Sequence, residues 1–308
     1  MYYFLVNEHG GSGKGSRRWD VVKPILDERG IQYEEYVPEY AGHATLLAKE
    51  ISKKSDDDIR IVILGGDGTI NEVLNGIEDF SRVKLALIPT GSGNDFSRGL
   101  HLPRHNPKKS LDMILNAGNG QKIDLGIVES AEINKKRIFG ISAGFGLDAI
   151  VGTGINTSKI KIALNKMHAG KLSYALLTIK TLFSMKTERV KVTFDDEETR
   201  EFNKLIFLAA MNFRAEGGGV PMAPKAKGND GFLTVCAAHG VPKFLTFLMF
   251  PFLCAGLHAR FKAFFIRDFT KMEIESEEKS TLHTDGELFG EVKKATFRVL
   301  KGELTVLA

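Results

Sequence analysis

The first part of the chain alternates short apolar runs with longer amphipathic segments. Each apolar run is bounded by glycine or polar residues, which is typical of a buried strand. In the segments between the runs, apolar residues recur with helical spacing. We expect strands at Tyr2–Val6, Tyr33–Val37, Ile59–Leu64 and Leu85–Ile88, and helices at Ser16–Arg29, Ala44–Lys54, Ile70–Gly76, Asn94–Gly99 and Lys108–Ala117. Strands and helices in alternation predict a parallel sheet covered by helices on both faces.

The pattern changes at about Lys122, where β-branched and aromatic runs begin to follow one another closely. Such spacing predicts a second, all-β unit similar to a sandwich. We expect its strands at Lys122–Val128, Arg137–Ser142, Arg189–Phe194, Lys204–Met211, Phe232–Ala238, Phe264–Ile266, Lys271–Glu275, Thr296–Leu300 and Leu304–Leu307. Helical insertions are expected at Ile155–Phe183 and Lys243–Leu257. The predicted domains are therefore an α/β domain over residues 1–126 and a β-sandwich domain over residues 127–308.

Composition agrees with two ordinary globular domains. Hydrophobic residues make up 43% of the 308 residues and charged residues 26%, and the formal net charge of +4 is too small to favour a nucleic-acid-binding protein. Cys236 and Cys254 form no cluster of metal-ligand spacing, which favours a reducing cytoplasmic setting. The apolar segment Phe244–Leu257 is too short to span a membrane and is interrupted by Pro251.

The first of three glycine-rich clusters, Asn7–Gly15, follows the first strand. Its glycines allow backbone N–H groups to approach an anion, and Lys14 adds a positive charge. The cluster is not a Walker A loop, because Glu8 and Gly15 stand where that motif needs glycine and a hydroxyl residue. Taken alone, it is equally well explained as a flexible turn between a strand and a helix.

The second cluster, Gly65–Thr69, lies directly between the Ile59–Leu64 strand and the next helix. Glycine costs roughly 0.5–1 kcal/mol inside regular structure, so several glycines around Asp67 are poorly explained by packing. They fit phosphates that lie against the backbone, with Asp67 contacting Mg²⁺ or a reacting hydroxyl. The alternative is a solvated turn in which Asp67 caps a helix.

The third cluster runs from Pro89 to Arg98 and again follows a strand. Asp95 and Arg98 are three residues apart, so both lie on one face of the helix that begins there. Asn94 or Asp95 could instead serve only as its cap. In an open α/β sheet, ligands bind at the carboxyl ends of the strands, where all three clusters would meet. The first domain is therefore predicted to bind a phosphorylated ligand.

These motifs resemble those of the diacylglycerol kinase catalytic domain family, which also includes sphingosine and ceramide kinases. The resemblance rests on GGDGTINEVLNG at 65–76 and PTGSGNDF at 89–96. In the second domain, MNFRAEGGGVPMAPKA at 211–226 with NDG at 229–231, and TDGE at 284–287, resemble later motifs of the family. The motifs extend from Asn7 to Glu287 in the family's order. One departure is Glu8, where the family often has proline.

The resemblance implies ATP and Mg²⁺ as cofactors and assigns roles to particular residues. The nucleotide site would comprise Asn7, Gly65, Gly66, Asp67, Gly68, Thr69, Glu72, Thr90, Gly91, Gly93, Asn94 and Asp95. Lys14 and Arg98 would stabilise the transferring charge, and Glu287 would be the general base, placed across a cleft between the domains. A structural Mg²⁺ would be held by Asp230, with Lys227 and Phe232 beside it. Asp230–Gly231 and Asp285–Gly286 are also ordinary turn pairs.

The expected activity is phosphorylation of a membrane lipid hydroxyl, with diacylglycerol converted to phosphatidic acid. A sphingoid base is an alternative acceptor. NAD kinases and phosphofructokinases share a GGDG loop after a strand, so a kinase acting on a soluble substrate is a second alternative. A non-catalytic regulator is a third, although Asp67, Asp95, Asp230 and Glu287 are all present.

A lipid substrate implies peripheral contact with a membrane, here the inner face of the cytoplasmic membrane. Between Asn156 and Thr193 many lysines and arginines accompany a single acid, Glu188, which would suit anionic headgroups. The alternative is a helix that packs on the sandwich with a solvated basic side. The Phe244–Leu257 segment could add shallow insertion into the bilayer. No nucleic-acid partner is expected, and the sequence leaves a homodimer open.

Overall fold

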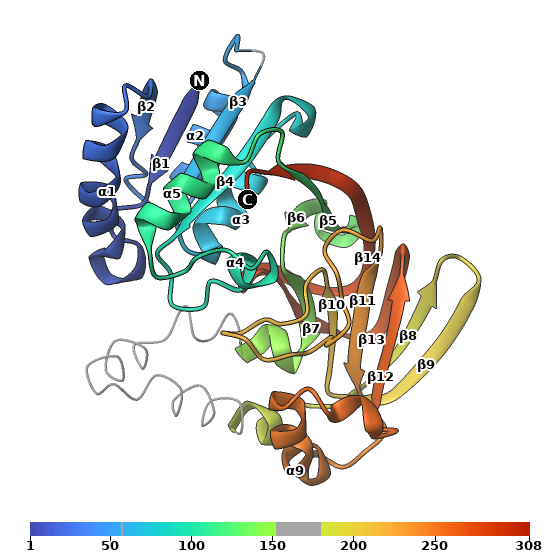
Figure 1. Ribbon diagram of the computed structural model, residues 1–308. Coiled ribbons are helices and arrows are strands. Elements are labelled where there is room, and N and C mark those ends of the chain that lie inside the picture. The colour runs from blue at the N-terminus through green and yellow to red at the C-terminus, as the bar shows by residue number, and fades with distance from the viewer. Residues whose placement is uncertain (57, 152–179) are drawn as a thin grey trace. The chain divides into compact units, whose positions relative to one another are not determined.

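The computed structural model describes residues 1–56, 58–151 and 180–308 and contains two compact units (Figure 1). The first unit comprises Met1–Leu125 with two later segments, Gly228–Gly231 and Leu300–Ala308. The second unit comprises Gly126–Lys227 and Phe232–Val299. The end of the chain therefore returns to the first unit.

The first unit is built on the parallel sheet that its apolar runs predict. The strands β1 (Tyr2–Val6), β2 (Tyr33–Tyr36), β3 (Ile59–Gly65) and β4 (Val83–Pro89) lie in the order β4-β3-β1-β2. Beside β4, Thr305 and Val306 of the last strand pair in parallel with Lys84 and Leu85. Because β3 and β4 end in register at Gly65 and Pro89, the loops that follow them begin at the same edge.

Helices cover both faces of this sheet. On one face, α1 (Gly10–Glu28) and α5 (Pro107–Asn116) contact each other and bury Trp19, Leu26 and Leu111 against Phe4 and Val62. The helices α2 (His43–Ser52) and α3 (Asp67–Leu74) pack on each other and on β3. The remaining short helices are α4 (Asp95–Gly99) and the 3-10 turn η1 (Phe80–Arg82). The predicted α/β architecture is confirmed.

The second unit is an antiparallel, sandwich-like β structure, as predicted. Its main sheet has the order β12-β11-β10-β7-β13-β14, β8 and β9 extend from β13, and β5 and β6 form a hairpin. Buried apolar residues fill both faces of the central strands. The bounds are β5 (Gln121–Ser130), β6 (Lys135–Phe139), β7 (Ser142–Gly146), β8 (Glu188–Phe194), β9 (Glu198–Leu205), β10 (Phe207–Met211), β11 (Leu233–Ala238), β12 (Phe264–Phe269), β13 (Lys271–Thr284) and β14 (Glu287–Val306), with 3-10 turns η2 (Ala131–Ile133) and η3 (His258–Arg260).

Several strand predictions in this unit were wrong in extent. The two runs expected at Thr296–Leu300 and Leu304–Leu307 belong to one long strand, β14. Strand β9 was missed because it lies in an exposed hairpin, where only Phe202 and Leu205 are buried and most other positions are polar. The predicted helix in the Lys243–Leu257 segment is confirmed as α9 (Lys243–Cys254). The insertion predicted at Ile155–Phe183 lies almost entirely outside the described residues.

A tight turn joins β13 to β14 and is fixed by the partly buried carboxylate of Asp285. Asp285 and Gly286 both have positive φ, which is typical of a two-residue hairpin turn, and Thr284 pairs with Glu287 across it. Both carboxylate oxygens of Asp285 accept backbone N–H bonds, from Gly140, Ile141 and Ser142, at 2.8–3.0 Å. The hairpin is thereby tied to the start of β7.

No helix within the described ranges is both long and apolar enough to cross a membrane.

Substitution of Asp285 with asparagine should lower the free energy of unfolding by about 2 kcal/mol, because an amide cannot replace a charged acceptor of three N–H groups. Asparagine tolerates the positive φ of this turn, so backbone strain does not enter the comparison. The matched control is Asp196→Asn, at another turn position of positive φ, where the side chain is 65% exposed and forms a surface ion pair with Lys271. Denaturant unfolding should show a loss below about 1 kcal/mol for the control. Equal losses for the two variants would contradict the structural role of Asp285.

Candidate active site

The three glycine-rich loops meet at the carboxyl edge of the parallel sheet, as the sequence predicts. The backbone N–H of Asn7 donates to Leu64 O, and that of Thr90 donates to Gly65 O, each at 2.9 Å. Gly66 and Gly91 lie against each other: a Cβ on Gly91 would be 2.9 Å from the Cα of Gly66. Side chains at these two positions would force the loops apart.

The first loop packs equally closely on the third. A Cβ on Gly11 would lie 1.9 Å from Thr90 O, and one on Gly10 would lie 3.0 Å from Thr90 Oγ1. Gly11, Ser12 and Gly13 have positive φ, so α1 becomes regular only after the loop. Lys14 follows and is exposed.

Asp67 joins the second loop to the third. It is the first residue of α3, and its carboxylate accepts the N–H groups of Asp95 and Phe96 at 3.1 and 3.3 Å. These amides open α4, so one carboxylate lies at the start of two helices, where negative charge is favoured. The sequence analysis gave Asp67 a part in metal or proton chemistry and kept a helix cap as the alternative. Helix α3 has no side-chain cap, so the carboxylate serves α4 instead of its own helix, and the chemical role stays a prediction.

Asp95 and Arg98 form the predicted pair on one face of α4. Arg98 Nε lies 3.1 Å from Asp95 Oδ1, and the guanidinium also donates to Gly93 O at 3.2 Å. The Asp95 side chain is buried, whereas about a third of the Arg98 side chain is exposed. An arginine guanidinium has five N–H donors, which is a chemistry that suits an anionic ligand.

Two other residues predicted for the nucleotide site contact neighbouring elements of the first unit. Asn7 Nδ2 donates to Thr69 Oγ1 at 2.9 Å, which links the first and second loops. Glu72 lies farther along α3, and its carboxylate accepts the N–H of Ala44 at 3.2 Å, in the first turn of α2. The structure thus gives Glu72 a role in holding α2 to α3. Its role in nucleotide binding stays a prediction.

The junction of the loops carries polar groups of the kind that a nucleotide needs. Among the described residues, the buried oxygens Thr90 Oγ1 and Asn94 Oδ1 have no hydrogen-bond partner, and both lie beside glycines of the junction. A hydroxyl can donate to a phosphate oxygen, and an amide oxygen can accept from a ribose hydroxyl. Glycine backbones and these oxygens together fit ATP, and the carboxylates of Asp67 and Asp95 are the hard oxygen donors that Mg²⁺ prefers.

The predicted structural metal residue, Asp230, lies in the Gly228–Gly231 segment of the first unit, while Lys227 and Phe232 belong to the second. This segment is anchored by Asp124, which sequence reasoning missed. The buried Asp124 carboxylate accepts the N–H groups of Gly231 and Gly302 at 2.7 and 2.6 Å. The sequence signal that could have indicated a structural role for Asp124 is an acidic residue inside the predicted strand Lys122–Val128. Metal binding by Asp230 stays a prediction.

Glu287, the predicted base, is the first residue of β14 in the second unit and is partly exposed. It directly follows the Asp285–Gly286 turn, which fixes its backbone. Its placement across a cleft from the nucleotide stays a prediction.

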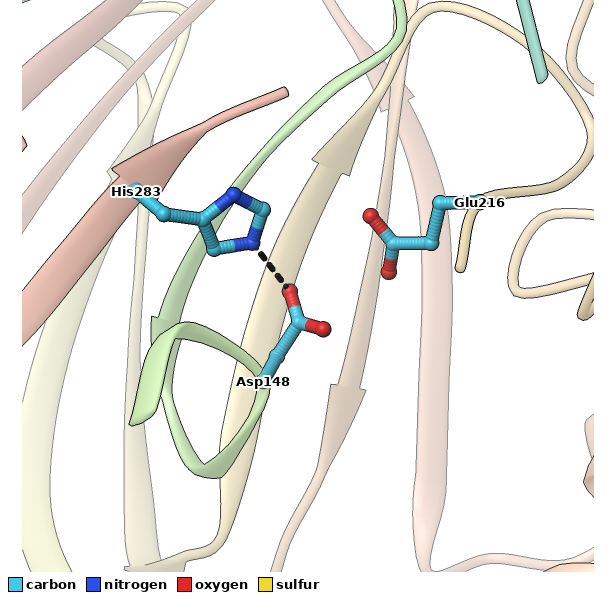
Figure 2. Close-up of side chains that lie close together, drawn as sticks. All are labelled: Asp148, Glu216 and His283. Atoms are coloured by element: carbon cyan, nitrogen blue, oxygen red, sulfur yellow. Dashed lines mark hydrogen bonds and ion pairs between the residues drawn. The ribbon is translucent and has the colours of Figure 1, made fainter. Parts of the chain in front are cut away.

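The second unit also contains a group of charged side chains to which sequence reasoning gave no role. Asp148, Glu216 and His283 offer ligand atoms that all lie within 4.8 Å of one another, and we call this group the acidic corner. In Figure 2 the His283 ring points at Asp148, and the Glu216 carboxylate faces the same place from another segment. His283 Nε2 lies 2.8 Å from Asp148 Oδ2. Glu216 lies inside the 211–226 motif and His283 directly precedes the 284–287 motif, but neither motif indicated that these side chains meet Asp148.

Gly144 makes room for the histidine–aspartate pair. It lies opposite His283 in the β7–β13 ladder, and a Cβ there would be 1.8 Å from Asp148 Oδ2. Burial lowers the pKa of His283, but nearby carboxylates, Asp148 foremost, outweigh it and raise this pKa to about 8. The Gly286 N–H donates to His283 Nδ1, so a neutral ring carries its proton on Nε2, toward Asp148. The corner thus brings two carboxyl groups and one imidazole together.

A cavity of about 120 Å³ adjoins the acidic corner within the second unit. Asp148 and Glu216 form part of its wall, and the rest is predominantly apolar, with Phe207, Phe250 and Phe264 among its residues. An apolar cavity with few polar groups suits an amphiphilic ligand, because the polar groups fix its orientation.

Comparison with known proteins agrees with both units. Residues 1–128 match the diacylglycerol kinase catalytic domain, and residues 142–308 match the YegS C-terminal NAD kinase beta sandwich-like domain. The chain is 27% identical over 303 residues to the diacylglycerol kinase of Staphylococcus carnosus, covering 98% of this chain and 93% of that protein. It is 29% identical over 268 residues to the diacylglycerol kinase of Bacillus subtilis, covering 86% and 82%.

Solved structures share the fold. A diacylglycerol kinase from Bacillus anthracis aligns over 100% of this chain and 96% of that chain, with a TM-score of 0.70 and 20% identity. Another chain from the same strain aligns with the same coverage, a TM-score of 0.78 and 25% identity. The loops, the second unit and the matched domains lead to one conclusion: this chain belongs to the diacylglycerol kinase family of lipid kinases.

Proposed function

We propose that the protein transfers the γ-phosphoryl group of ATP to the free hydroxyl of diacylglycerol, giving phosphatidic acid and ADP. The observation that supports ATP as donor is the contact of Gly66 with Gly91 beside the buried Thr90 and Asn94 oxygens. Support for a lipid acceptor comes from the family and from the apolar cavity of the second unit. The relatives named diacylglycerol kinase favour diacylglycerol over a sphingoid base.

The reaction needs positioning and charge stabilisation more than covalent chemistry. A bond forms between the lipid hydroxyl oxygen and the γ-phosphorus while the bond to the ADP oxygen breaks. In this proposal Glu287 accepts the hydroxyl proton, and Lys14 and Arg98 stabilise charge on the phosphoryl oxygens. Asp67 and Asp95 would hold Mg²⁺, which neutralises phosphate charge when bound.

We also propose that α9 contacts the membrane. Phe244, Leu248 and Phe252 are four residues apart along α9, so they form one stripe, and they are 59%, 50% and 45% exposed. The opposite side of the helix, with Thr246, Phe250 and Leu253, lines the cavity. The exposed stripe would enter the bilayer surface, on the cytoplasmic side. The basic positions Lys159, Lys161, Lys166 and Lys171 lie outside the described residues.

The kinase proposal predicts that purified protein with Mg²⁺ and labelled ATP phosphorylates dioleoylglycerol in mixed micelles, as seen by chromatography of the lipid product. Glu287→Gln should lower kcat by about 10²-fold or more, the usual contribution of a general base. Asp67→Asn should lower activity to a similar extent and also reduce the melting temperature slightly, because the capping of α4 is weakened.

Asp196→Asn is the matched control for both variants and should keep full activity. An active Glu287→Gln enzyme would disprove the base assignment. Sphingosine and NAD are tested in parallel, and phosphorylation of NAD in place of any lipid would establish the soluble-substrate alternative.

We further propose that Asp230 binds the structural Mg²⁺ that the family resemblance implies. This predicts that Mg²⁺ raises the melting temperature of the wild-type protein but not of Asp230→Ala. A ligand that binds only the folded state at about a hundred times its Kd adds about 2.7 kcal/mol of stability. Asp196→Ala removes an exposed acid elsewhere and should keep the Mg²⁺ response. If Asp230→Ala responds to Mg²⁺ as the wild type does, Asp230 is no metal ligand.

The membrane proposal predicts that Phe244→Ser, Leu248→Ser and Phe252→Ser together weaken vesicle co-sedimentation by about tenfold or more, because apolar area drives insertion. Leu46→Ser, which changes an equally exposed leucine of α2, is the control and should bind normally. Binding should also increase with anionic lipid and decrease with salt. Undiminished binding of the triple variant would place the membrane contact elsewhere.

A further inference from the structure

The acidic corner has a chemical character that the phosphoryl transfer described above does not use. Asp148 and Glu216 reach the cavity wall, whereas His283 lies behind Asp148 and holds it by the 2.8 Å contact. His283 and Glu216 are only 3% and 7% exposed. Two carboxyl groups therefore lie at one end of a predominantly apolar cavity.

A third polar group lies on the cavity wall. Thr246, on the inner side of α9, is 9% exposed, and its hydroxyl has no hydrogen-bond partner among the residues described. A buried hydroxyl without a partner costs free energy, which a ligand oxygen or nitrogen atom would recover. The cavity thus offers a hydroxyl as well as the carboxylates to the polar part of an amphiphile.

Carboxylates select among amphiphiles in two ways. They accept hydrogen bonds but donate none, so they bind O–H and N–H groups. They also repel anions, and in apolar surroundings this repulsion is poorly screened by salt. Hydrogen bonding alone would admit every lipid with a free hydroxyl, including anionic lipids whose headgroup is a glycerol phosphate.

We propose that the acidic corner makes the cavity selective for uncharged lipid alcohols and excludes lipids with an anionic headgroup, the phosphorylated product among them. This inference rests on the proposed function, in that the cavity is taken to be the acceptor site. A protein that docks on an anionic surface meets anionic lipids in excess, so its acceptor site needs a charge filter that its docking surface lacks. The same filter disfavours rebinding of the product.

The test is a binding measurement without nucleotide, so that it does not depend on turnover. Short-chain monomeric lipids displace a fluorescent diacylglycerol from the full-length protein. The three competitors are dioctanoylglycerol, dioctanoyl phosphatidylglycerol and dioctanoyl phosphatidate. Wild-type protein should bind dioctanoylglycerol at least about tenfold more tightly than either anionic lipid, a difference of about 1.4 kcal/mol. The ratio should persist in high salt, whereas vesicle docking should not.

Glu216→Gln and Asp148→Asn keep the shape of the wall and remove one charge each, so each should reduce the ratio to about threefold or less. Glu291→Gln, which removes an exposed charge elsewhere in the second unit, should leave the ratio unchanged. Thr246→Val should weaken binding of all three lipids alike. A variant that fails to fold is recognised by its melting curve. The inference is then tested by the binding ratio of the wild-type protein and by the charge variant that does fold.

Equal binding of charged and uncharged lipids by the wild-type protein would overturn the inference, as would an unchanged ratio in both charge variants. Loss of lipid binding on addition of EDTA to the Asp230→Ala variant, which lacks the other proposed metal ligand, would assign the corner to a metal ion and also overturn the inference. Selective binding without any phosphorylation would refute the proposed function alone. Phosphorylation of diacylglycerol without selectivity would refute this inference alone.

Discussion

The close contact between Gly66 and Gly91 is the constraint on which the first unit depends. Strands β3 and β4 end in register, so their loops leave the same edge of the sheet, and only residues without side chains allow the backbones to touch. With the loops in contact, the Asp67 carboxylate reaches the first amides of α4 from the start of α3. Glycine loses more backbone entropy on folding than other residues, so its use at these positions follows from the close approach of the two backbones.

In the second unit a glycine also allows a close approach, here of two side chains to the backbone of a strand. Gly144 leaves room above β7 for the Asp148 carboxylate and the His283 ring. Burying charges this deeply is costly, and the ion pair offsets the cost only because its geometry is fixed. Asp285 holds the hairpin that carries His283, and Gly286 of the same turn donates to its second ring nitrogen. Another buried histidine, His258, contacts no carboxylate in the described chain, and burial lowers its pKa.

The sequence predicted most of the first unit because its information is local. Each strand is a continuous apolar run, and each glycine-rich loop directly follows its strand, so a short window of residues contains both. The second unit was predicted only in outline. Strand β9 is polar at most positions because it is an exposed edge, and β14 reads as two strands because Lys301 and Gly302 interrupt its apolar pattern. The acidic corner draws Asp148, Glu216 and His283 from three distant segments, and only the folded sheet brings them together.

This contrast follows from what each half has to recognise. Every acceptor uses the same phosphate donor, and phosphate can be bound by backbone amides, which glycine-rich loops supply whatever the rest of the sequence is. An acceptor is recognised by the shape and charge of a cavity, and those come from side chains contributed by many strands. Motifs therefore identify the donor chemistry of such a chain readily. In our proposal its acceptor is decided by side chains such as Glu216 and Thr246, which different segments of the second unit contribute to one cavity wall.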